Sequence, residues 1–407
     1  MSLRTAVVSE KRSSPGIMAF KSMRIAYLSD STIPSCKANS IQVMQMCRAF
    51  ADAGHDVTLF SRPGADEVDD YACYGVGRNF NIVKTPAFGT RRIREWRYAR
   101  ATRNEMRRRS PFDLIYGRHL PSLAVAACGD TPFVYEAHQP ASRTGRVVEH
   151  LLFRRANLAK TVFISEALQQ EYLRRYSSLP LGKTQVCHDG AAEPLADARF
   201  AVPRPQNARL RVGYIGSFSI GRGAEFVCGL AQRMKDFEFH LCGGTPEAIA
   251  KCRRTVLGCE NIQFHGLVTP SATQSWQQSM DILLAPYQRN SPIIRWMSPL
   301  KVFEYMAARR PIIASDVPVL SEVLTDGVNA LLVPPDDHEG WEVALRRLND
   351  TDHRVALAEC AYKDFISAFT WDKRVTNVLD GITIQNGSSS VKSDSPFKHN
   401  CNAQINS

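Results

Sequence analysis

The chain has 407 residues, of which 44 % are apolar, 22 % charged and 9 % aromatic. This composition excludes a mostly disordered chain, and the length predicts two lobes with a sizeable buried core. The formal net charge is +11, and residues 91–109 hold nine arginines against two glutamates, so 9 − 2 = +7 of it lies in one segment. We find no membrane-spanning apolar run, no secretory leader and no CxxC pair, and therefore expect a cytoplasmic protein with reduced thiols.

Short apolar runs alternate with amphipathic segments through the first half of the chain. The expected strands are 24–29, 57–60, 81–83, 113–116, 133–135, 161–164 and 185–187. The expected helices are 40–53, 91–109, 120–127, 147–157 and a segment that begins at 165. Because the first of these strands, 24–29, is a short apolar run and not an alternating one, it indicates burial on both faces, and strands that alternate with helices indicate a parallel sheet covered by helices.

The same pattern restarts after a proline-containing stretch at 196–208, which we interpret as a linker. The second set of expected strands is 210–215, 238–242, 262–265, 281–285, 311–314 and 330–333, with helices at 225–234 and 300–308. Two doubly wound halves place a ligand where the carboxyl ends of both sheets face a shared cleft. The expected parts are a flexible extension 1–22, Rossmann-like domains 23–197 and 198–370, a helix 371–385 that returns to the first domain, and a disordered tail 386–407.

A glycine-rich turn, Gly216 to Gly223, joins the expected strand 210–215 to the next helix. Glycines admit backbone N–H groups close to an anion, the helix N-terminus adds partial positive charge, and Arg222 is able to bind two phosphate oxygens. The turn matches neither the dinucleotide fingerprint nor the P-loop. It therefore predicts an anion site, with a turn merely shaped by its glycines as the alternative.

The helix expected at 300–308 carries a second set of candidate residues. Ser298 is the expected N-cap and Pro299 the first helical residue, which places Lys301 beside free N–H groups suited to a diphosphate. Glu304 lies one turn further on and is suited to the vicinal hydroxyls of a ribose. A helical ion pair between Lys301 and Glu304 is the alternative. Glu322, after the next strand, is either a partner of this site or a surface charge.

Several motifs in a fixed order resemble glycosyltransferase family 4 over about residues 23–380. They are Tyr-Ile-Gly-Ser…Arg-Gly (214–223), Asn-Ile-Gln-Phe-His-Gly (261–266), Asp-Ile-Leu-Leu-Ala-Pro-Tyr (281–287), Ser-Pro-Leu-Lys-Val-Phe-Glu-Tyr-Met-Ala (298–307) and Pro-Ile-Ile-Ala-Ser-Asp-Val-Pro (311–318), with Tyr-Glu-Ala-His (135–138) in the first half. The resemblance implies an α/β GT-B fold, with two Rossmann-like doubly wound parallel-sheet domains that face a central cleft. It also implies transfer from a nucleotide-sugar donor with retention of anomeric configuration.

The resemblance implies a role for each matched position. Catalytic roles fall on His138, Arg222 and Lys301, although a lone histidine after a strand is often a core residue. The residues implied in donor binding are Gly216, Ser217, Arg222, Gly223, Ser298, Pro299, Leu300, Lys301 and Glu304. The loop 31–40, with Ala38, Asn39 and Ser40, matches the loop that closes over sugar and acceptor.

Three departures from the family pattern bear on specificity. The first glutamate of the Glu-x7-Glu motif is replaced by Trp296, which puts the identity of the donor sugar in doubt. Ser217 lies near the position of a second basic residue, and Lys37-Ala-Asn39 replaces a glycine pair. Arg222 and Lys301 are then the main cations facing the leaving phosphate, where developing charge is best stabilised.

The leading hypothesis is a glycosyltransferase of the hexosyltransferase type that needs neither metal nor cofactor. It moves a sugar to a glycan or lipid-linked acceptor in surface polysaccharide biosynthesis. Asp350-Thr-Asp352 is interpreted as a surface turn, and His188 with Asp189 lacks further ligands at metal-site spacing. The alternatives are a nucleotide-sugar 2-epimerase and a non-catalytic GT-B subunit, which only Trp296 favours.

The basic segment Arg91–Arg109 has two readings. No nucleic-acid motif accompanies it, so we expect no nucleic-acid partner. The segment is either a solvated helix face or a peripheral contact with the inner face of the membrane, made by its arginines with Ile93, Trp96 and Met106.

Overall fold

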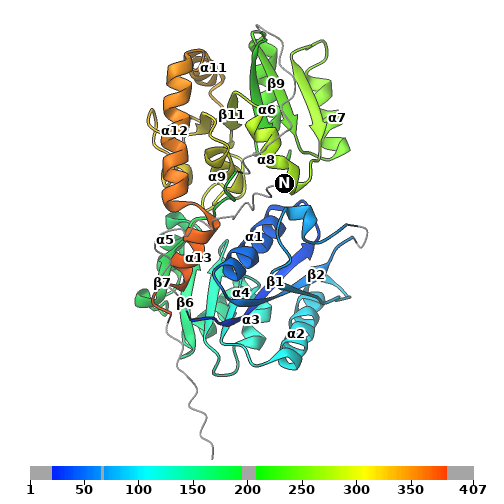
Figure 1. Cartoon of the computed structure of the whole chain (residues 1–407), viewed down its shortest axis with the longest axis vertical. Coiled ribbons are helices and arrows are strands. Elements are labelled where there is room, and N and C mark those ends of the chain that lie inside the picture. Colours follow the sequence, from blue (N-terminus) through cyan, green and yellow to red (C-terminus); the bar gives the residue numbers. More distant parts are fainter. Residues whose placement is uncertain (1–20, 66–67, 195–207, 383–407) are drawn as a thin grey trace, which may run out of the picture.

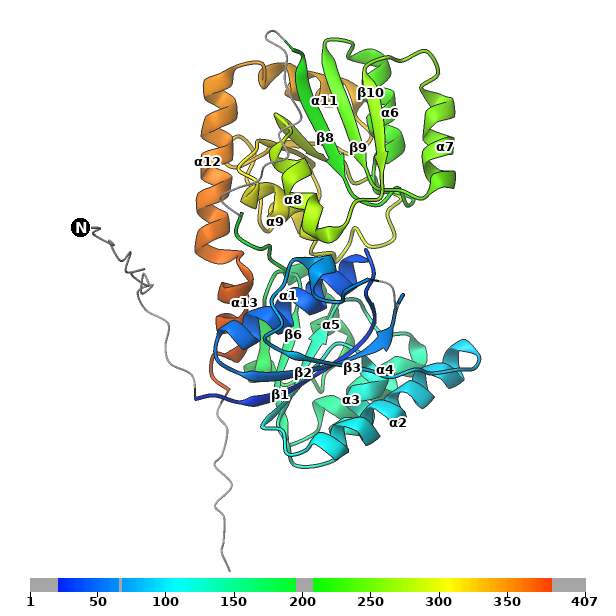
Figure 2. The same cartoon turned by 45° about the vertical axis from the view of Figure 1, so that its right-hand side comes forward.

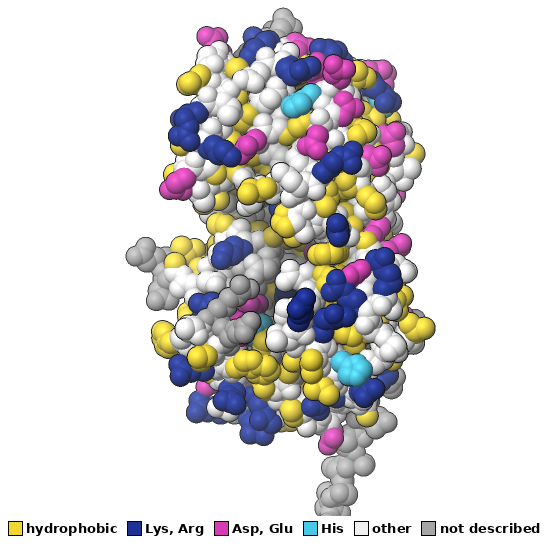
Figure 3. Space-filling model, turned by 180° about the vertical axis from the view of Figure 1, so that it is seen from behind, with side chains coloured by type: hydrophobic (Ala, Val, Ile, Leu, Met, Phe, Trp, Pro, Cys, Tyr) yellow, Lys and Arg dark blue, Asp and Glu magenta, His cyan; other side chains and the backbone are white. Residues whose placement is uncertain are grey.

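The computed structural model describes residues 21–65, 68–194 and 208–382. The extension expected at 1–22, the linker at 196–208 and the tail at 386–407 therefore lie wholly or largely outside the described residues. The chain forms two α/β lobes, one above the other in Figures 1 and 2, and the space-filling view in Figure 3 shows a waist between them. Within the described residues no helix combines the length and apolar character needed to cross a membrane.

The N-terminal lobe contains a seven-stranded, all-parallel sheet in the order β3-β2-β1-β4-β5-β6-β7. Its strands are β1 (Arg24–Ile33), β2 (Asp56–Pro63), β3 (Asn81–Lys84), β4 (Leu114–Gly117), β5 (Phe133–Ala137), β6 (Leu158–Phe163) and β7 (Thr184–Val186). Its helices are α1 (Ala38–Asp52), η1 (Ala72–Tyr74), α2 (Arg91–Arg109), α3 (Leu120–Ala126), α4 (Arg143–Phe153), α5 (Glu166–Arg175) and η2 (Leu181–Lys183). The strand order is that of a doubly wound sheet, which binds ligands beyond its carboxyl ends.

The C-terminal lobe repeats this architecture with six parallel strands in the order β10-β9-β8-β11-β12-β13. The strands are β8 (Leu210–Ile215), β9 (Phe237–Cys242), β10 (Ile262–Gly266), β11 (Ile282–Ala285), β12 (Ile312–Ser315) and β13 (Leu331–Val333). The helices are α6 (Ala224–Arg233), α7 (Pro246–Thr255), α8 (Pro270–Gln278), α9 (Leu300–Ala307), α10 (Pro318–Ser321), α11 (His338–Arg347) and α12 (Thr351–Ala368). Two Rossmann-like lobes of this kind are the GT-B arrangement that the sequence predicts.

Local sequence explains most boundaries. The central strands β4, β5 and β11 are buried along their whole length, in keeping with their apolar sequences. Helix α4 begins at Arg143, four residues before the expected start, because the Ser142 side chain accepts a hydrogen bond from Gly145 N and caps the helix there. Ser165 caps α5 in the same way.

The last described helix, α13 (Trp371–Leu379), crosses back to the N-terminal lobe below α12 (Figure 1). It packs against α1, and its residues Trp371, Val375, Val378 and Leu379 belong to the same buried cluster as strands β1 and β2. Arg374 on this helix is only 2 % exposed. The C-terminal end of the chain therefore forms part of the N-terminal lobe's core and places a cation inside it.

Candidate active site

The glycine-rich turn between β8 and α6 is held in place by one tyrosine. Tyr214, near the end of β8, donates hydrogen bonds to the carbonyl oxygens of Ser217 (2.6 Å) and Arg222 (3.0 Å) and so joins both ends of the turn. Gly223 adopts φ 99°, and a Cβ there would overlap the carbonyl oxygen of Pro286. The positive φ and the neighbouring loop therefore both require glycine at this position. This agrees with the alternative interpretation, in which the glycines shape the turn. The anion-site interpretation depends on what faces the turn.

Lys301, in the first turn of α9, faces this turn with its ammonium group buried. A Cβ on Gly216 would lie 2.9 Å from Lys301 Nζ, so the glycine makes room for the lysine. Lys301 Nζ lies 4.1 Å from the ring centroid of Tyr214 and 5.1 Å from that of Tyr287, and among the residues that the structure describes it has no hydrogen-bond partner. The Arg222 guanidinium lies 5.7 Å from the Tyr287 ring. Two cations thus share one aromatic wall beside the glycine turn.

Burial of the ammonium group is the main cause of a lowered pKa at Lys301, and the positive charge of Arg222 lowers this pKa further. Together they lower the pKa of Lys301 to about 7, against an opposing effect of Glu304. The helical ion pair between Lys301 and Glu304, which was the alternative interpretation, is not formed. An unpartnered buried ammonium is costly unless an anion approaches it, so this arrangement is typical of a site for a bound anionic group.

The expected helix cap at Ser298 is wrong. α9 begins at Leu300, Pro299 is its N-cap residue, and no side chain caps the helix. The Ser298 hydroxyl instead accepts a hydrogen bond from Asp189 N (2.8 Å), which lies beyond β7 of the other lobe. A residue before proline favours extended backbone, which keeps Ser298 outside the helix. The uncapped N–H groups of the first turn still point away from the helix beside Lys301.

Glu304 lies one turn further along α9, at the wall of a pocket between the lobes. Its Oε2 accepts a hydrogen bond from Gln277 Nε2 (2.9 Å), and burial raises its pKa. The pocket has a volume of about 400 Å³ and includes Glu304, Gln277, Gln45 and Trp371 in its wall. These residues come from α9, α8, α1 and α13, so both lobes contribute to the space beside the carboxylate.

The acceptor-side loop is shorter than expected. Strand β1 continues to Ile33 and α1 begins at Ala38, so Ala38, Asn39 and Ser40 are helical and not part of a loop. Side-chain contacts explain the extension, because Asn39 Nδ2 donates to Ser31 Oγ (3.0 Å) and Ser40 Oγ donates to the carbonyl oxygen of Thr32 (2.9 Å). These bonds hold the first turn of α1 against the end of β1.

His138 follows β5 at the carboxyl edge of the N-terminal sheet. Its Nε2 lies 2.5 Å from Glu136 Oε1, and its side chain is 18 % exposed. Glu136 is fully buried and also contacts Gln42, Tyr116 and Arg374. Glu136, which lies two residues before His138 in the quoted Tyr-Glu-Ala-His motif, is thus the centre of a buried network that holds His138.

Two residues near the expected site, Trp296 and Glu322, join the two lobes. Trp296 packs against the N-terminal cluster that contains Tyr135 and Phe163, and its carbonyl oxygen accepts a hydrogen bond from Ser165 Oγ (3.0 Å). Glu322 accepts hydrogen bonds from the backbone N–H groups of residues 166 and 167 (2.7 and 2.9 Å) at the start of α5. Glu322 is therefore a helix cap across the lobe boundary and not a plain surface charge.

One group within the described residues has metal-ligand types close together, namely Asp30, Glu95 and His119. Arg62 Nη2 lies 2.5 Å from Glu95 Oε2, the oxygen that also faces His119 Nε2. The guanidinium already supplies the positive charge that a metal ion would bring to this carboxylate, so the group does not fit a cation site. Asp350 caps α12 by accepting from Asp352 N and His353 N, as expected of a surface turn.

Sequence reasoning missed the aromatic wall and the network behind His138. Tyr214 and Tyr287 both stand at strand ends inside the quoted motifs, and their proximity to a glycine turn was a usable signal. Arg374 gave no such signal, since it lies 238 residues from the carboxylate that it contacts.

Comparisons with known proteins match both lobes. The family description "Glycosyltransferase Family 4" matches residues 40–191, and "Glycosyl transferases group 1" matches residues 209–350. The chain is 24 % identical over 346 residues to a phosphatidyl-myo-inositol mannosyltransferase of Mycolicibacterium smegmatis, with 81 % of this chain and 85 % of the relative covered. It is 24 % identical over 401 residues to the MMP alpha-(1->4)-mannosyltransferase of Mycolicibacterium hassiacum, with 86 % and 95 % covered. The solved structure of Anabaena HepE in complex with UDP-glucose shares its fold, with a TM-score of 0.67 and 16 % identity over 88 % of this chain and all of that chain.

Proposed function

The chain belongs to the GT-B glycosyltransferases of the family 4 type, and we propose that it transfers a hexose from a nucleotide-diphosphate donor with retention of anomeric configuration. The buried, unpartnered Lys301 ammonium carries this proposal. Lys301, Arg222 and the glycine turn surround one space, and a diphosphate there supplies the negative charge that both cations lack. Gly216, Ser217 and Gly223 contribute backbone to this space, with Ser298, Pro299 and Leu300 at the helix start.

The remaining donor contacts follow from the positions around α9. Glu304 lies one turn beyond Lys301, at the distance along the helix that separates a diphosphate from its ribose. Its carboxylate accepts hydrogen bonds from the two ribose hydroxyls in this proposal, and the inter-lobe pocket beside it provides space for further parts of the nucleotide. His138 contacts the sugar from the opposite lobe.

The reaction breaks the bond between the anomeric carbon and the leaving phosphate oxygen. The acceptor hydroxyl forms the new bond on the same face of the sugar, and its proton passes to the leaving phosphate. Negative charge grows on that phosphate in the transition state, where Lys301, Arg222 and the α9 N–H groups stabilise it. These cations take the place of a divalent metal, so we propose metal-independent transfer.

The sugar and acceptor are suggested by the relatives alone. Two relatives that span most of this chain are named mannosyltransferases, one of them acting on a phosphatidyl-inositol lipid by its name, and HepE was solved with UDP-glucose. We therefore propose a mannosyl or glucosyl donor and a glycan or lipid-linked acceptor in surface polysaccharide biosynthesis. Trp296 replaces the carboxylate expected beside the sugar. The identity of the donor sugar therefore has to be determined with a panel of nucleotide sugars.

A lipid-linked acceptor gives helix α2 a role. Phe88, Ile93 and Trp96 are 77 %, 52 % and 43 % exposed, and Arg97 and Arg100 are exposed beside them. Met106, expected on the same face, packs toward the N-terminal core instead. We propose that the exposed stripe contacts the anionic inner face of a membrane, and that the chain is otherwise cytoplasmic.

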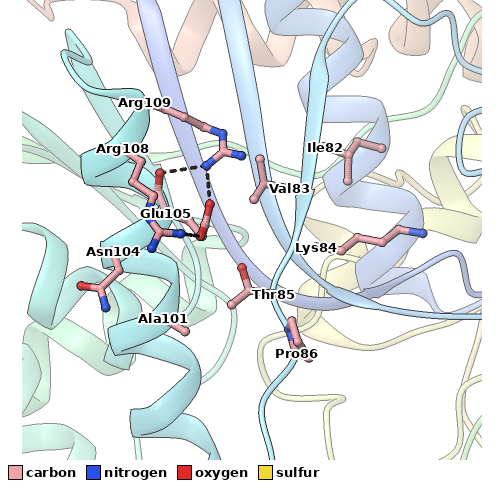
Figure 4. A pocket seen from close by; sticks show the side chains of 10 residues that line it. All are labelled: Ile82, Val83, Lys84, Thr85, Pro86, Ala101, Asn104, Glu105, Arg108 and Arg109. Carbon is pink, nitrogen blue, oxygen red and sulfur yellow. Dashed lines mark hydrogen bonds and ion pairs between the residues drawn. The ribbon is translucent and has the colours of Figure 1, made fainter.

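The far end of α2 is less suited to this contact. A pocket with a volume of about 600 Å³ lies between α2 and β3. Figure 4 shows Glu105 at this pocket with Arg108 and Arg109, both of which bind its carboxylate. Their charges are partly neutralised there, so the first half of α2 is the membrane-facing half in this proposal.

Nucleotide binding tests the donor site directly. Thermal shift of the full chain with UDP, GDP, ADP and dTDP is expected to show stabilisation by one of them, about 2.7 kcal/mol at a hundred times its Kd. Lys301→Met and Glu304→Ala abolish the shift, and Lys251→Met, at an exposed ion-paired lysine of α7, leaves it unchanged. Absence of a shift with every nucleotide contradicts the proposal and favours a non-catalytic subunit.

A further inference from the structure

A buried network reaches His138 from the helix that returns from the C-terminal lobe. Arg374, on α13, donates through Nη1 to Glu136 Oε2 (2.9 Å) and through Nε to the carbonyl oxygen of His188 (2.9 Å). Tyr116 donates to the same Glu136 oxygen. Arg374 and Glu136 are both essentially inaccessible to water. Glu136 Oε2 is therefore the acceptor for both the Arg374 guanidinium and the Tyr116 hydroxyl.

The other carboxylate oxygen faces His138. Glu136 Oε1 accepts from Gln42 Nε2 (2.8 Å) and lies 2.5 Å from His138 Nε2. Burial raises the pKa of Glu136, but the charge of Arg374, together with the contact of His138 and the charge of Arg118, outweighs it and holds that pKa well below the usual range. An ionised carboxylate only accepts hydrogen bonds, so the ring nitrogen facing it must carry the proton.

The second ring nitrogen is then left with a lone pair. Burial, with the charge of Arg118 added, lowers the pKa of His138 to about 4, so the ring is neutral at pH 7. Within the described residues His138 Nδ1 has no hydrogen-bond partner, and the side chain is partly exposed. A neutral imidazole with a proton on Nε2 presents Nδ1 as an acceptor.

We infer that Arg374 and Glu136 are positioning residues that hold His138 in the Nε2–H tautomer, so that Nδ1 accepts a hydrogen bond from a sugar hydroxyl. His138 then orients the sugar by accepting a hydrogen bond from it. The ring neither donates a hydrogen bond to a phosphate nor acts as an acid. The assignment of the hydroxyl to a bound donor sugar rests on the proposed function. The tautomer itself does not, because it follows from the buried contacts of Glu136 together with the neutral state of the His138 ring.

The same network connects the sugar end of the site to the diphosphate end. Arg374 Nη2 lies 3.6 Å from Asp189 Oδ1, and Asp189 N donates to Ser298 Oγ just before α9. One guanidinium therefore lies between His138 and the start of the helix that carries Lys301. The C-terminal helix thus positions groups at both ends of the proposed donor.

The test uses the full chain with ¹⁵N-labelled histidine, and the imidazole nitrogens are assigned with His138→Asn. The wild-type spectrum at pH 7 is expected to show Nε2 protonated and Nδ1 unprotonated. A spectrum with Nδ1 protonated, or with both nitrogens protonated at pH 7, overturns the inference without any variant. The measurement needs neither donor nor acceptor, so its result is separate from the fate of the proposed function.

Glu136→Gln provides the decisive variant. The amide has one carbonyl oxygen, which the Arg374 guanidinium attracts because it only donates, so the NH₂ group is expected to face His138 and donate to Nε2. The tautomer is therefore expected to change to Nδ1–H. Retention of Nε2–H in a folded Glu136→Gln protein contradicts the inference. Arg374→Lys keeps the cation and is expected to keep the wild-type tautomer.

Glu149→Gln is the matched control. Glu149 is a second fully buried carboxylate of the same lobe, bonded to the hydroxyls of Tyr135, Tyr172 and Tyr176 and not to His138. It is expected to lose stability while leaving the His138 spectrum unchanged. In a transfer assay Glu136→Gln is expected to lose about tenfold in kcat with the Glu149 variant near wild type. An equal loss in both variants assigns Glu136 a structural role only.

Discussion

Lys301 is predicted to bind a proton when the nucleotide binds. In the free protein its pKa is about 7, so at pH 8 roughly one-tenth of the molecules carry the charge. A diphosphate at the ammonium restores the charged form, because an opposite charge within about 4–6 Å raises the pKa of a lysine. The complex should then take up about 0.9 proton per nucleotide at pH 8, whereas at pH 6 Lys301 itself takes up only about 0.1.

Isothermal titration calorimetry in buffers of different ionisation enthalpy measures this number. At pH 8 the terminal phosphate, with a second pKa near 6, is already ionised, so it contributes little to the uptake. Lys251→Met is expected to retain the uptake, since that lysine is exposed and paired with Glu225. Tight binding at pH 8 with no proton uptake in the wild type refutes the assignment of the diphosphate to Lys301.

Further predictions concern stability, the glycine turn, the lobe boundary and α2. Because the pKa of Lys301 is lowered in the folded protein, the unfolded chain binds more protons between pH 7 and about 10.5. The free energy of unfolding without ligand therefore rises with pH across that range. In denaturant titrations Lys301→Met is expected to flatten this rise. Tyr214→Phe removes two hydrogen bonds from the turn and is expected to weaken nucleotide affinity by about 1–2 kcal/mol in calorimetry, with an unchanged Kd as the contrary result. Glu322→Ala removes the cap on α5 and should lower the free energy of unfolding by about 1–2 kcal/mol, whereas an unchanged Tm shows that the contact is not formed in solution. Arg94, Arg97, Arg100 and Arg103 changed together to Gln should lose about 1 kcal/mol per charge in binding to anionic liposomes, and unaltered binding removes α2 from the membrane contact.

The fold was largely predictable from local sequence. Apolar runs such as 210–215 and 282–285 are buried on both faces only in a parallel sheet with helices on each side, and that pattern fixes the fold class. Boundaries failed where a side chain from outside the pattern intervened. Ser142 starts α4 early, and Ser298 is taken by Asp189 N from the other lobe, so it cannot cap α9.

The candidate site was predictable where it depends on local sequence and not where it depends on distant side chains. Gly216, Arg222 and Lys301 lie at strand-to-helix turns, where sequence position implies an anion site, and the structure gathers them beside Tyr214 and Tyr287. Glu136, the partner of His138, belongs to a network drawn from four separate elements, β5, α1, β4 and α13, and Arg374 reaches it only because α13 returns to the first lobe. No local pattern records such long-range burial of an ion pair.

The most direct test of the central claim is a transfer assay with the purified full chain. GDP-mannose, UDP-glucose and other nucleotide sugars are incubated with and without a lipid extract, and the nucleoside diphosphate released and the anomeric configuration of the product are measured. The proposed function predicts release from one donor that depends on the acceptor, without added metal, and a product with the configuration of the donor. Inversion of configuration, epimerised donor, or no release from any donor would contradict it.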